Sequence, residues 1–218
     1  SLEQLALIAK QLGYFGICFA EYYKNEDQIK KLQAEIEKVK QKIGIEIFLG
    51  FEARNLKELS ILREKRRKFD ILLVMGGDLR LNREAVETPE IDVLTHPEYE
   101  RQDSGLDHVS AKLAAKNNVA IEVNFREVLV SSKRTRSIIL KHISHNVRLA
   151  KKYKAPVIAC SGALSHWDIC DPQCLVSFAS LLGLRLNEAK ATVSKIPEKI
   201  IKQIKERRSE EWVMPGVK

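Results

Sequence analysis

The sequence contains a concentrated set of cationic side chains, a residue type that binds phosphate groups. Eight lysines and arginines lie between Val128 and Trp167, a stretch of forty residues without a single Asp or Glu. The remaining 29 basic residues equal the 29 acidic residues of the chain, so the net charge of +8 belongs to this stretch. Because a charge concentrated in one segment creates a local field that attracts polyanions, we expect nucleic acid as a partner.

The spacing of these cations fits one face of a helix over residues 134–154. At about 100° per residue, a polar stripe and an apolar stripe fall on opposite sides of this helix. The polar stripe consists of Arg134, Lys141, His145, Arg148 and Lys152, and the apolar one of Ile139, Ile143, Val147 and Ala150. We assign His142 to the polar side as well. Each phosphate bound by such a stripe releases counterions and adds affinity independent of base sequence. The alternative is a solvated surface face, the usual role of a charge run.

A second basic row is expected on a helix over residues 107–116. His108, Lys112 and Lys116 are spaced i, i+4 and i+8, which places them on one face of that helix. Asp107, at its start, is expected to interact favourably with the helix dipole. The chain therefore offers two helical rows of cations for a polyanion.

Two loops that follow strands add further cations. Arg80 and Arg83 lie in the loop 78–83, and their guanidinium groups suit bidentate phosphate contacts. Arg101 lies in the loop 101–105. Since ligands of parallel α/β folds bind at loops leaving the carboxyl ends of strands, both loops are candidate contact sites.

The elements that must position these residues alternate between short apolar strands and helices. Strands are expected at 14–20, 45–51, 70–75, 91–95, 119–123 and 157–161, and helices at 2–12, 27–42, 56–67, 82–87, 107–116, 134–154, 172–182, 187–193 and 197–207. The strand at 14–20 is a continuous apolar run, as expected for a strand covered on both faces. With no internal repeat and no Pro- or Gly-rich linker, we expect one domain over residues 1–208 and a C-terminal tail over 209–218.

This alternation, without a hairpin signal, predicts a parallel sheet built from right-handed crossovers. The sheet is either open and doubly wound or closed into a TIM-type (β/α) barrel. No G-x-G-x-x-G and no P-loop follows a strand, which favours the barrel.

Cysteine usage and hydropathy indicate the compartment. Cys18 and Cys160 lie in apolar strand-like runs, where we expect small buried side chains. Cys170 and Cys174 form a C-x3-C pair that could bind a metal ion, but no second pair stands at zinc-ligand spacing. No apolar stretch reaches the length of a membrane span, and no signal-peptide pattern is present. We expect a cytoplasmic protein.

The middle of the chain resembles a known family. Residues 104–114 (SGLDHVSAKLA) followed by 118–123 (NVAIEV) are similar to the central signature of ribonuclease P protein component 3. Supporting pieces are DLR at 78–80, ACSGA at 159–163, DP at 171–172, and AKA at 189–191 with Pro197 after it. The resemblance implies a PHP-like barrel with six to seven mostly parallel strands. That family opens with a barrel strand, whereas this chain begins with a helix, so we expect a barrel lacking its first strand and open on one side.

The resemblance also implies a function. Ribonuclease P removes the 5′ leader of precursor tRNA, and in this family the catalytic centre belongs to the RNA, where Mg²⁺ does the chemistry. The protein is expected to bind no cofactor and to contact ribonuclease P RNA, precursor tRNA and a small protein subunit, in a heterotetramer. The RNA-contact candidates in matching motifs are Arg80, Arg83, Arg101, His108, Lys112 and Lys116. The positive charge of the helix expected over residues 134–154, and not the resemblance, adds four further RNA-contact candidates: Arg134, Lys141, Arg148 and Lys152.

Two alternative functions compete with this one. PHP-type barrels are phosphoesterases that hold metal ions through a His-x-His motif and later His, Asp and Glu residues. This chain has no His-x-His, but His96, His166 and Asp168 follow strands and would face the same end of a barrel. These three are fewer than a two-metal site needs, and hydrogen-bonded polar residues at loop starts explain them better. A further alternative is a protein-interaction module whose basic helix docks an acidic partner.

Overall fold

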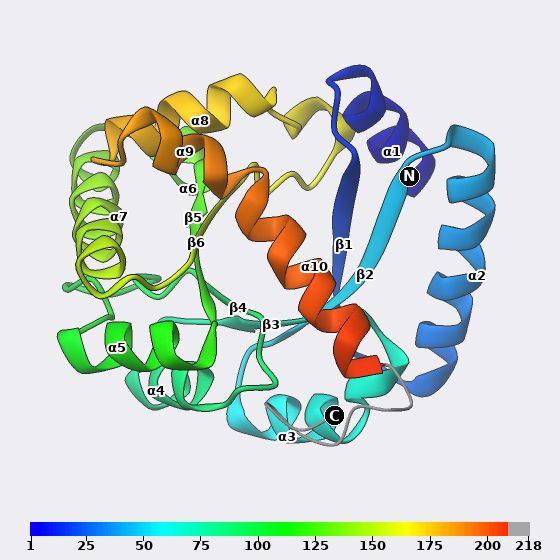
Figure 1. The fold of residues 1–218 in the computed structure, drawn as a ribbon, viewed down its shortest axis with the longest axis horizontal. Helices are drawn as coiled ribbons and strands as arrows, with labels where there is room; N and C mark the ends of the chain where they lie inside the picture. The colour runs from blue at the N-terminus through cyan, green and yellow to red at the C-terminus, as the bar shows by residue number, and fades with distance from the viewer. Residues whose placement is uncertain (209–218) are drawn as a thin grey trace.

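The computed structural model describes residues 1–208, which are built around a sheet of six parallel strands. The strands follow one another in chain order: β1 (Gly16–Tyr22), β2 (Glu46–Ala53), β3 (Ile71–Met75), β4 (Val93–Thr95), β5 (Ala120–Asn124) and β6 (Val157–Cys160). Every neighbouring pair is parallel, so each connection crosses over and contains a helix. Figure 1 shows the sheet curled into a half-barrel with helices around it.

The helices surround this sheet, and most begin at a capping side chain. They are α1 (Leu2–Gln11), α2 (Glu26–Ile43), α3 (Leu56–Glu64), α4 (Leu79–Glu87), α5 (His108–Asn117), α6 (Phe125–Val130), α7 (Lys133–Tyr153), α8 (Pro172–Leu181), α9 (Leu186–Thr192) and α10 (Lys195–Arg208), with short 3-10 helices η1 (Arg66–Lys68) and η2 (His166–Asp168). Asn or Asp precedes α2, α3, α4, α5, α6 and α8, and its side chain accepts a backbone N–H of the first turn. Polar caps therefore fix where these helices start, and α4 begins at Leu79 rather than near 82 because Asp78 caps it.

The half-barrel is open between its first and last strands. Within the described residues, β1 pairs with β2 alone and β6 with β5 alone, so the sheet has two edges. The chain after β6 crosses toward α1, and the Tyr14 hydroxyl donates to the carbonyl oxygen of Cys170 at 2.7 Å. The α/β class and the open side are confirmed, and the barrel is a half-barrel of six strands.

The sheet separates two apolar layers. Ile121 and Val123 of β5 face the outer layer, which packs against the surrounding helices, whereas Ala120 faces the inner, concave side. Ile200 and Ile204 of α10 fill that concave side against Phe48 and other inward residues of β2 to β6. Helix α10 thus occupies the inside of the half-barrel at the amino-terminal ends of the strands.

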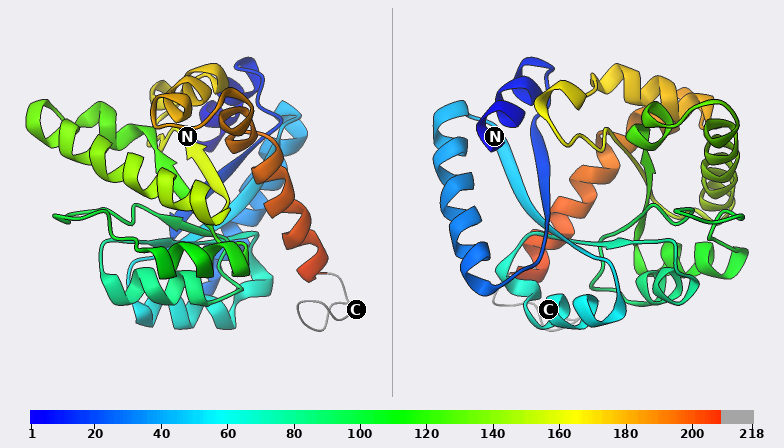
Figure 2. Two further views of the ribbon diagram at one scale, coloured as in Figure 1. Left: turned by 60° about the vertical axis from the view of Figure 1, so that its left-hand side comes forward. Right: turned by 180° about the vertical axis from the view of Figure 1, so that it is seen from behind.

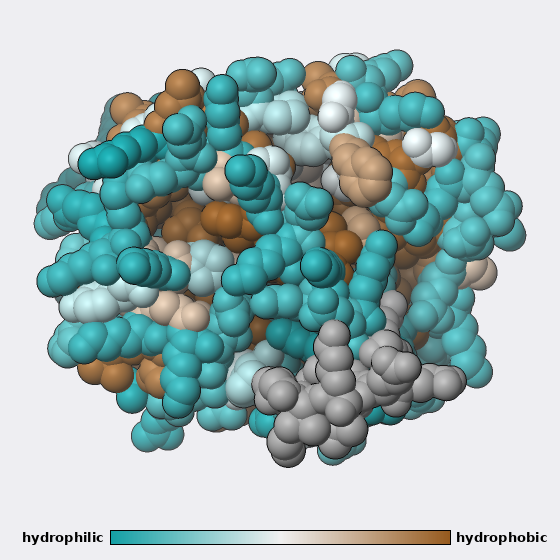
Figure 3. Space-filling model, in the orientation of Figure 1, coloured by the Kyte–Doolittle hydropathy of each residue, from teal (hydrophilic) through white to brown (hydrophobic). Residues whose placement is uncertain are grey.

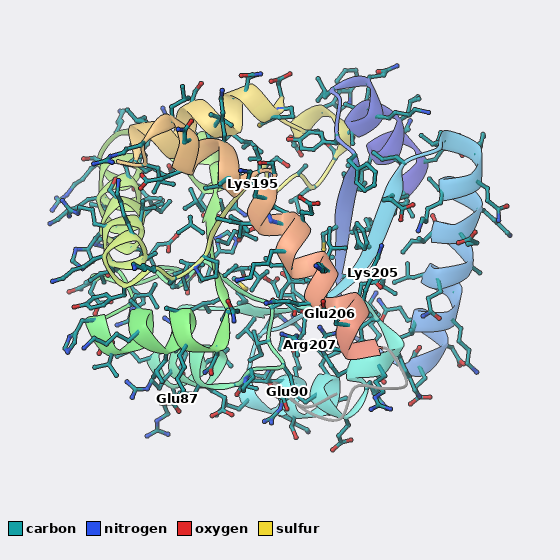
Figure 4. The ribbon with its side chains drawn as sticks, in the orientation of Figure 1. Glu87, Glu90, Lys195, Lys205, Glu206 and Arg207 are labelled. Atoms are coloured by element: carbon teal, nitrogen blue, oxygen red, sulfur yellow. The ribbon has the colours of Figure 1, made fainter. Side chains whose placement is uncertain are left out.

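Polar contacts hold α10 in this position. Arg207 donates to Asp92 at 2.8 Å, and Arg66 contacts the other carboxylate oxygen of Asp92 at 2.5 Å. Asp92 directly precedes β4 and is only 2% exposed, so the two guanidinium groups compensate a buried charge. Lys199 donates to the Asn118 side chain at 3.1 Å. Figure 4 labels Lys205, Glu206 and Arg207 along the C-terminal end of this helix.

Strand β1 differs from the sequence-based prediction. Ile17 and Phe19 pack against the outer core, but Cys18, Ala20 and Tyr22 on the other face are exposed. The prediction of a strand covered on both faces was wrong, as was the prediction that Cys18 is buried. The physical reason is that α10 fills the concave side against β2 to β6, and this inner apolar cluster of the described chain contains no residue of β1. Gly50 of β2 allows the close approach of Cys18, since a Cβ there would lie 2.8 Å from the Cys18 sulfur.

Candidate nucleic-acid interface

Two neighbouring helices on the outside of the half-barrel carry rows of exposed cations. Helices α5 and α7 are in contact, and Figure 2 (left) shows them stacked above α4. The rows consist of His108, Lys112 and Lys116 on α5 and of Lys141, Arg148 and Lys152 on α7, and all six side chains are exposed. We call these six residues the basic surface. Figure 3 shows hydrophilic residues along the left edge of the molecule, where α7 and α5 lie.

The opposite face of α7 anchors it to the outer core. Ile143, Val147 and Ala150 are each 1% exposed, which matches the apolar stripe expected from helical periodicity. His142 was misassigned, because it is 7% exposed and lies on the buried face. Desolvation lowers the pKa of His142, and the positive charge of Lys141 acts in the same direction. His142 is therefore a core residue and not part of the cationic row, whereas His145 is exposed.

The amino-terminal end of α7 is cationic against the preference of its own dipole. Lys133, Arg134 and Arg136 lie in its first turns, all exposed, and no acidic residue accompanies them. A helix dipole disfavours each such cation by roughly 0.3–1 kcal/mol. Arg136 offsets part of this cost by donating to the carbonyl oxygens of Leu129 and Ser131, whereas Lys133 and Arg134 form no ion pair or side-chain hydrogen bond within the described residues.

The basic surface is not neutralised by its own chain. Among the residues that the structure describes, none of the six forms an ion pair within 4.0 Å, although acidic and basic residues pair elsewhere on the surface. Tyr153 joins the two rows, because the Nζ atoms of Lys112 and Lys152 each lie 5.4 Å from its ring centroid. The surface is thus one continuous cationic area across α5 and α7.

The arginines predicted in the two strand-end loops have different surroundings, and Arg80 and Arg83 lie within α4 rather than in a loop because the helix begins at Leu79. Arg80 is exposed, whereas Arg83 pairs with Glu87 one turn along α4. Arg101 contacts Asp103 through two nitrogens at 2.6 and 2.8 Å and donates to the Gly77 carbonyl oxygen at 2.8 Å. This contact lowers the pKa of Asp103 to about 2. Arg101 joins the two loops to each other, so it is less available to a ligand than Arg80.

Buried amides fix these loops to the helices. The Asn82 side chain donates to the carbonyl oxygens of Pro97 and Gly105 at 3.0 and 2.9 Å. Asn146 of α7 donates to the Ser104 carbonyl oxygen at 2.8 Å and to Glu98 at 3.3 Å. Asn146 was not predicted from the sequence, although a polar residue within an apolar helical stripe is the pattern that could have indicated a buried hydrogen-bonding role.

A small polar group lies at the carboxyl ends of β4 and β5. The His96 Nε2 atom is 3.8 Å from Glu122 Oε2 and 3.3 Å from the Asn124 amide nitrogen. Burial raises the pKa of Glu122, which is 9% exposed, and the nearby His96 partly opposes this. Burial also raises the pKa of Glu98 to about 7. These carboxylates are protein-interior groups rather than solvent-facing ligands.

The residues proposed for a phosphoesterase are not assembled into a metal site. Asp168 accepts the Ser165 N–H at 2.9 Å and the Ser165 hydroxyl at 3.0 Å, and it lies 3.8 Å from Arg126. These hydrogen bonds lower its pKa. His166 stacks on Trp167 in the same turn, whereas His96 belongs to the group beside Glu122. Among the described residues, no group of three or more His, Cys, Asp or Glu is placed to hold a metal ion.

Fold and site together define an α/β half-barrel protein with an uncompensated cationic surface on its outer helices. Comparison with known proteins identifies its family. A family model for RNase P subunit p30 matches residues 1–209, and the chain belongs to that family. The resemblance inferred from the central signature is confirmed, and with it the assignment as a protein subunit of ribonuclease P.

Individual relatives agree with this family. The chain is 36% identical over 220 residues to ribonuclease P protein component 3 of Methanosarcina mazei, covering 100% of this chain and 88% of the relative. The protein of the same name from Methanococcoides burtonii is 34% identical, with 99% and 86% covered. A chain in a cryo-EM structure of archaeal ribonuclease P with mature tRNA superposes with a TM-score of 0.84 at 30% identity, covering 99% of this chain and 93% of that one. These comparisons support the ribonuclease P assignment and give no support to a phosphoesterase.

The described helices also show whether this part of the chain could span a membrane. Within the described part of the chain, no helix has the length and apolar character needed to cross a bilayer.

Proposed function

We propose that this subunit binds ribonuclease P RNA through the basic surface and supports RNA-catalysed removal of the 5′ leader from precursor tRNA. The observation that carries the proposal is the set of six exposed basic residues on α5 and α7, five of them Lys or Arg, without ion-pair partners in the described chain. Three more cations at the start of α7 extend this charge at a cost to the helix itself. In a ribonucleoprotein enzyme, a cationic surface of this kind is suited to bind the phosphates of the RNA.

The chemistry and the assembly follow from this role. Mg²⁺ in the RNA supplies the catalysis, and the protein contributes contacts and no cofactor. The partners are ribonuclease P RNA, precursor tRNA and a small protein subunit, in a heterotetramer, and the location is the cytoplasm. A solved archaeal ribonuclease P with mature tRNA, which contains a chain of this fold, supports the RNA and tRNA partners.

A charge-removal experiment tests the RNA-binding surface. Lys116, Lys141 and Arg148 are exposed, so the triple variant K116Q/K141Q/R148Q removes three positive charges with little effect on packing. Because each lost phosphate contact lowers the salt slope of log K by roughly 0.7–0.9, we expect the slope to fall by about 2–3. Filter binding of ribonuclease P RNA across a salt series measures this.

The matched control removes the same charge from another face. Lys30, Lys31 and Lys38 are exposed on α2, where Glu35 and Glu37 accompany them. The variant K30Q/K31Q/K38Q should keep affinity and salt slope close to those of the unmodified chain. Equal losses in both triple variants would contradict a defined surface, and no loss in either would remove α5 and α7 from the interface.

An activity assay separates the subunit from a hydrolase. The purified chain with Mg²⁺ and precursor tRNA, but without ribonuclease P RNA, should give no cleavage, because the catalytic centre belongs to the RNA. Robust RNA-free hydrolysis that is lost on His96→Ala would instead establish the phosphoesterase function.

A further inference from the structure

The chain after β6 presents a tryptophan to solvent. Trp167 is 84% exposed, the largest exposed fraction among the exposed large apolar residues of the described chain, and Leu164 in the same loop is 76% exposed. An exposed indole offers a large, flat apolar face together with an N–H donor to a binding partner. The role already assigned to the basic surface does not use this side chain.

The turn that carries Trp167 is locally fixed. The Asp168 carboxylate closes it by accepting both the N–H and the hydroxyl of Ser165. The imidazole of His166 lies against the indole, with ring centroids 4.5 Å apart and an interplanar angle of 39°. One part of the indole is therefore supported by its own turn, while most of the ring stays open to solvent. A ring held in this way loses little conformational entropy when a second ring stacks on it.

The charges around this turn favour an anionic partner. The acid-free stretch extends to Trp167, and Asp168 directly after it lies 3.8 Å from Arg126, which offsets its charge. The turn follows β6, Arg80 lies in the first turn of α4 after β3, and Arg101 lies in the loop after β4. Because these strands are parallel, all three segments leave the same end of the half-barrel. That end therefore carries both Trp167 and the exposed Arg80.

The small number of exposed apolar side chains near Trp167 favours base stacking over protein docking as the role of its indole. Between residues 160 and 175, Leu164 and Trp167 are the only exposed large apolar side chains of the described structure. The core of a protein interface is a contiguous apolar area of several side chains. Trp167 with one exposed leucine in its loop is too small an apolar area for such a core, whereas one aromatic ring is enough to stack on an unpaired base, which offers a π-face. We propose that Trp167 is a stacking platform for an unpaired base of the bound RNA, an inference that rests on the proposed RNA-binding function.

Fluorescence tests the contact directly. The chain has two tryptophans, and the second, Trp212, lies outside the described residues, so the variant W212F leaves Trp167 as the single indole. The probes are a short single-stranded oligoribonucleotide of mixed sequence and the same strand in a blunt duplex. We expect strong quenching of Trp167 by the single strand and little by the duplex, whose bases are already stacked. Equal quenching by both, or none by either while both bind, would overturn the proposal.

Binding of ribonuclease P RNA provides a second readout. Since base stacking on an aromatic ring contributes roughly tenfold or more in affinity, W167A should weaken binding by about that factor, whereas W167F should retain most of it. The salt slope should stay unchanged in both, because no phosphate contact is removed. Leu181→Ala, which shortens another side chain of 76% exposure, serves as the control and should bind like the unmodified chain.

The outcomes separate this inference from the function on which it rests. Normal RNA affinity in W167A without quenching in W212F refutes stacking and leaves the basic surface intact as the RNA site. Absence of RNA binding in the unmodified chain refutes the proposed function and stacking together. If W167A binds RNA normally but no longer binds the small protein subunit, Trp167 is a protein-docking residue and the proposal is wrong.

Discussion

Replacing Glu98 by Gln should remove the pH-dependent loss of stability that the buried Glu98 carboxyl causes. Glu98 is 8% exposed, and its Oε2 atom accepts the Asn146 amide at 3.3 Å. Burial is the largest cause of its raised pKa, the negative charges of Glu122 and Glu127 add to it, and a backbone hydrogen bond and His96 oppose it. The glutamine amide has nearly the same shape, carries no charge, and can donate to Asn146 Oδ1, a buried atom without a hydrogen-bond partner in the described structure.

The expected magnitude follows from the pKa. A rise from 4.5 in the unfolded chain to about 7 in the folded one means that the folded state binds the proton more tightly. Protonated Glu98 therefore contributes stability that is fully present below pH 4.5 and is lost as the pH rises through 7. At about 1.4 kcal/mol per pH unit, the loss is about 3 kcal/mol above pH 7. We expect E98Q to equal the unmodified chain near pH 4.5 and to exceed it by up to about 3 kcal/mol at pH 8.

Urea denaturation followed by circular dichroism at several pH values measures this difference. The control is Glu100→Gln, which removes the charge of an exposed carboxylate two residues away and should follow the unmodified chain at every pH. Subtracting the free energy of unfolding of the unmodified chain from that of E98Q at each pH isolates the contribution of Glu98 from those of the other titrating groups. A difference between E98Q and the unmodified chain that does not change with pH would refute the reasoning, as would lower stability of E98Q at pH 8.

Two further predictions concern folding. Arg207→Met should destabilise the chain by roughly 3–5 kcal/mol in urea denaturation, because it leaves the buried Asp92 with less charge compensation, whereas Arg67→Met at an exposed position should have little effect. Gly105→Ala should strongly reduce the soluble folded yield, since its φ is +71° and a Cβ there would lie 1.8 Å from the Pro97 carbonyl oxygen. Gly183→Ala, with a φ of +105° and open space around the position, should cost only roughly 1 kcal/mol, and equal effects at both glycines would contradict the steric argument.

The sequence predicts features that depend on neighbours along the chain. Asp107 caps α5 as expected, accepting the Ser110 N–H at 2.7 Å, and the polar and apolar stripes of α7 lie on the expected faces. Features that depend on distant segments were not predictable in this way. The exposed face of β1 results from the curl of the whole sheet, which local hydropathy does not encode.

The site residues show the same difference between features set by nearby residues of the sequence and features set by distant segments. The exposure of Lys112 and Lys116 follows from helical spacing, whereas the burial of His142 depends on what packs against its face of α7. Arg101 contacts Asp103 two residues away, but its second partner, the Gly77 carbonyl oxygen, belongs to another loop. Spacing therefore identifies cations, and only the fold shows which of them remain available.

The position of α10 determines when the half-barrel can be completed during synthesis. Its contact with Asp92 spans 115 residues of sequence, and the inward side chains of β2 to β6 depend on its isoleucines for cover. Until the ribosome has released residue 207, the concave face of the sheet is exposed apolar surface. Contacts of such long sequence separation form late and slowly. A nascent chain whose six strands have been made but whose α10 has not therefore carries an aggregation-prone surface, and docking of α10 removes it.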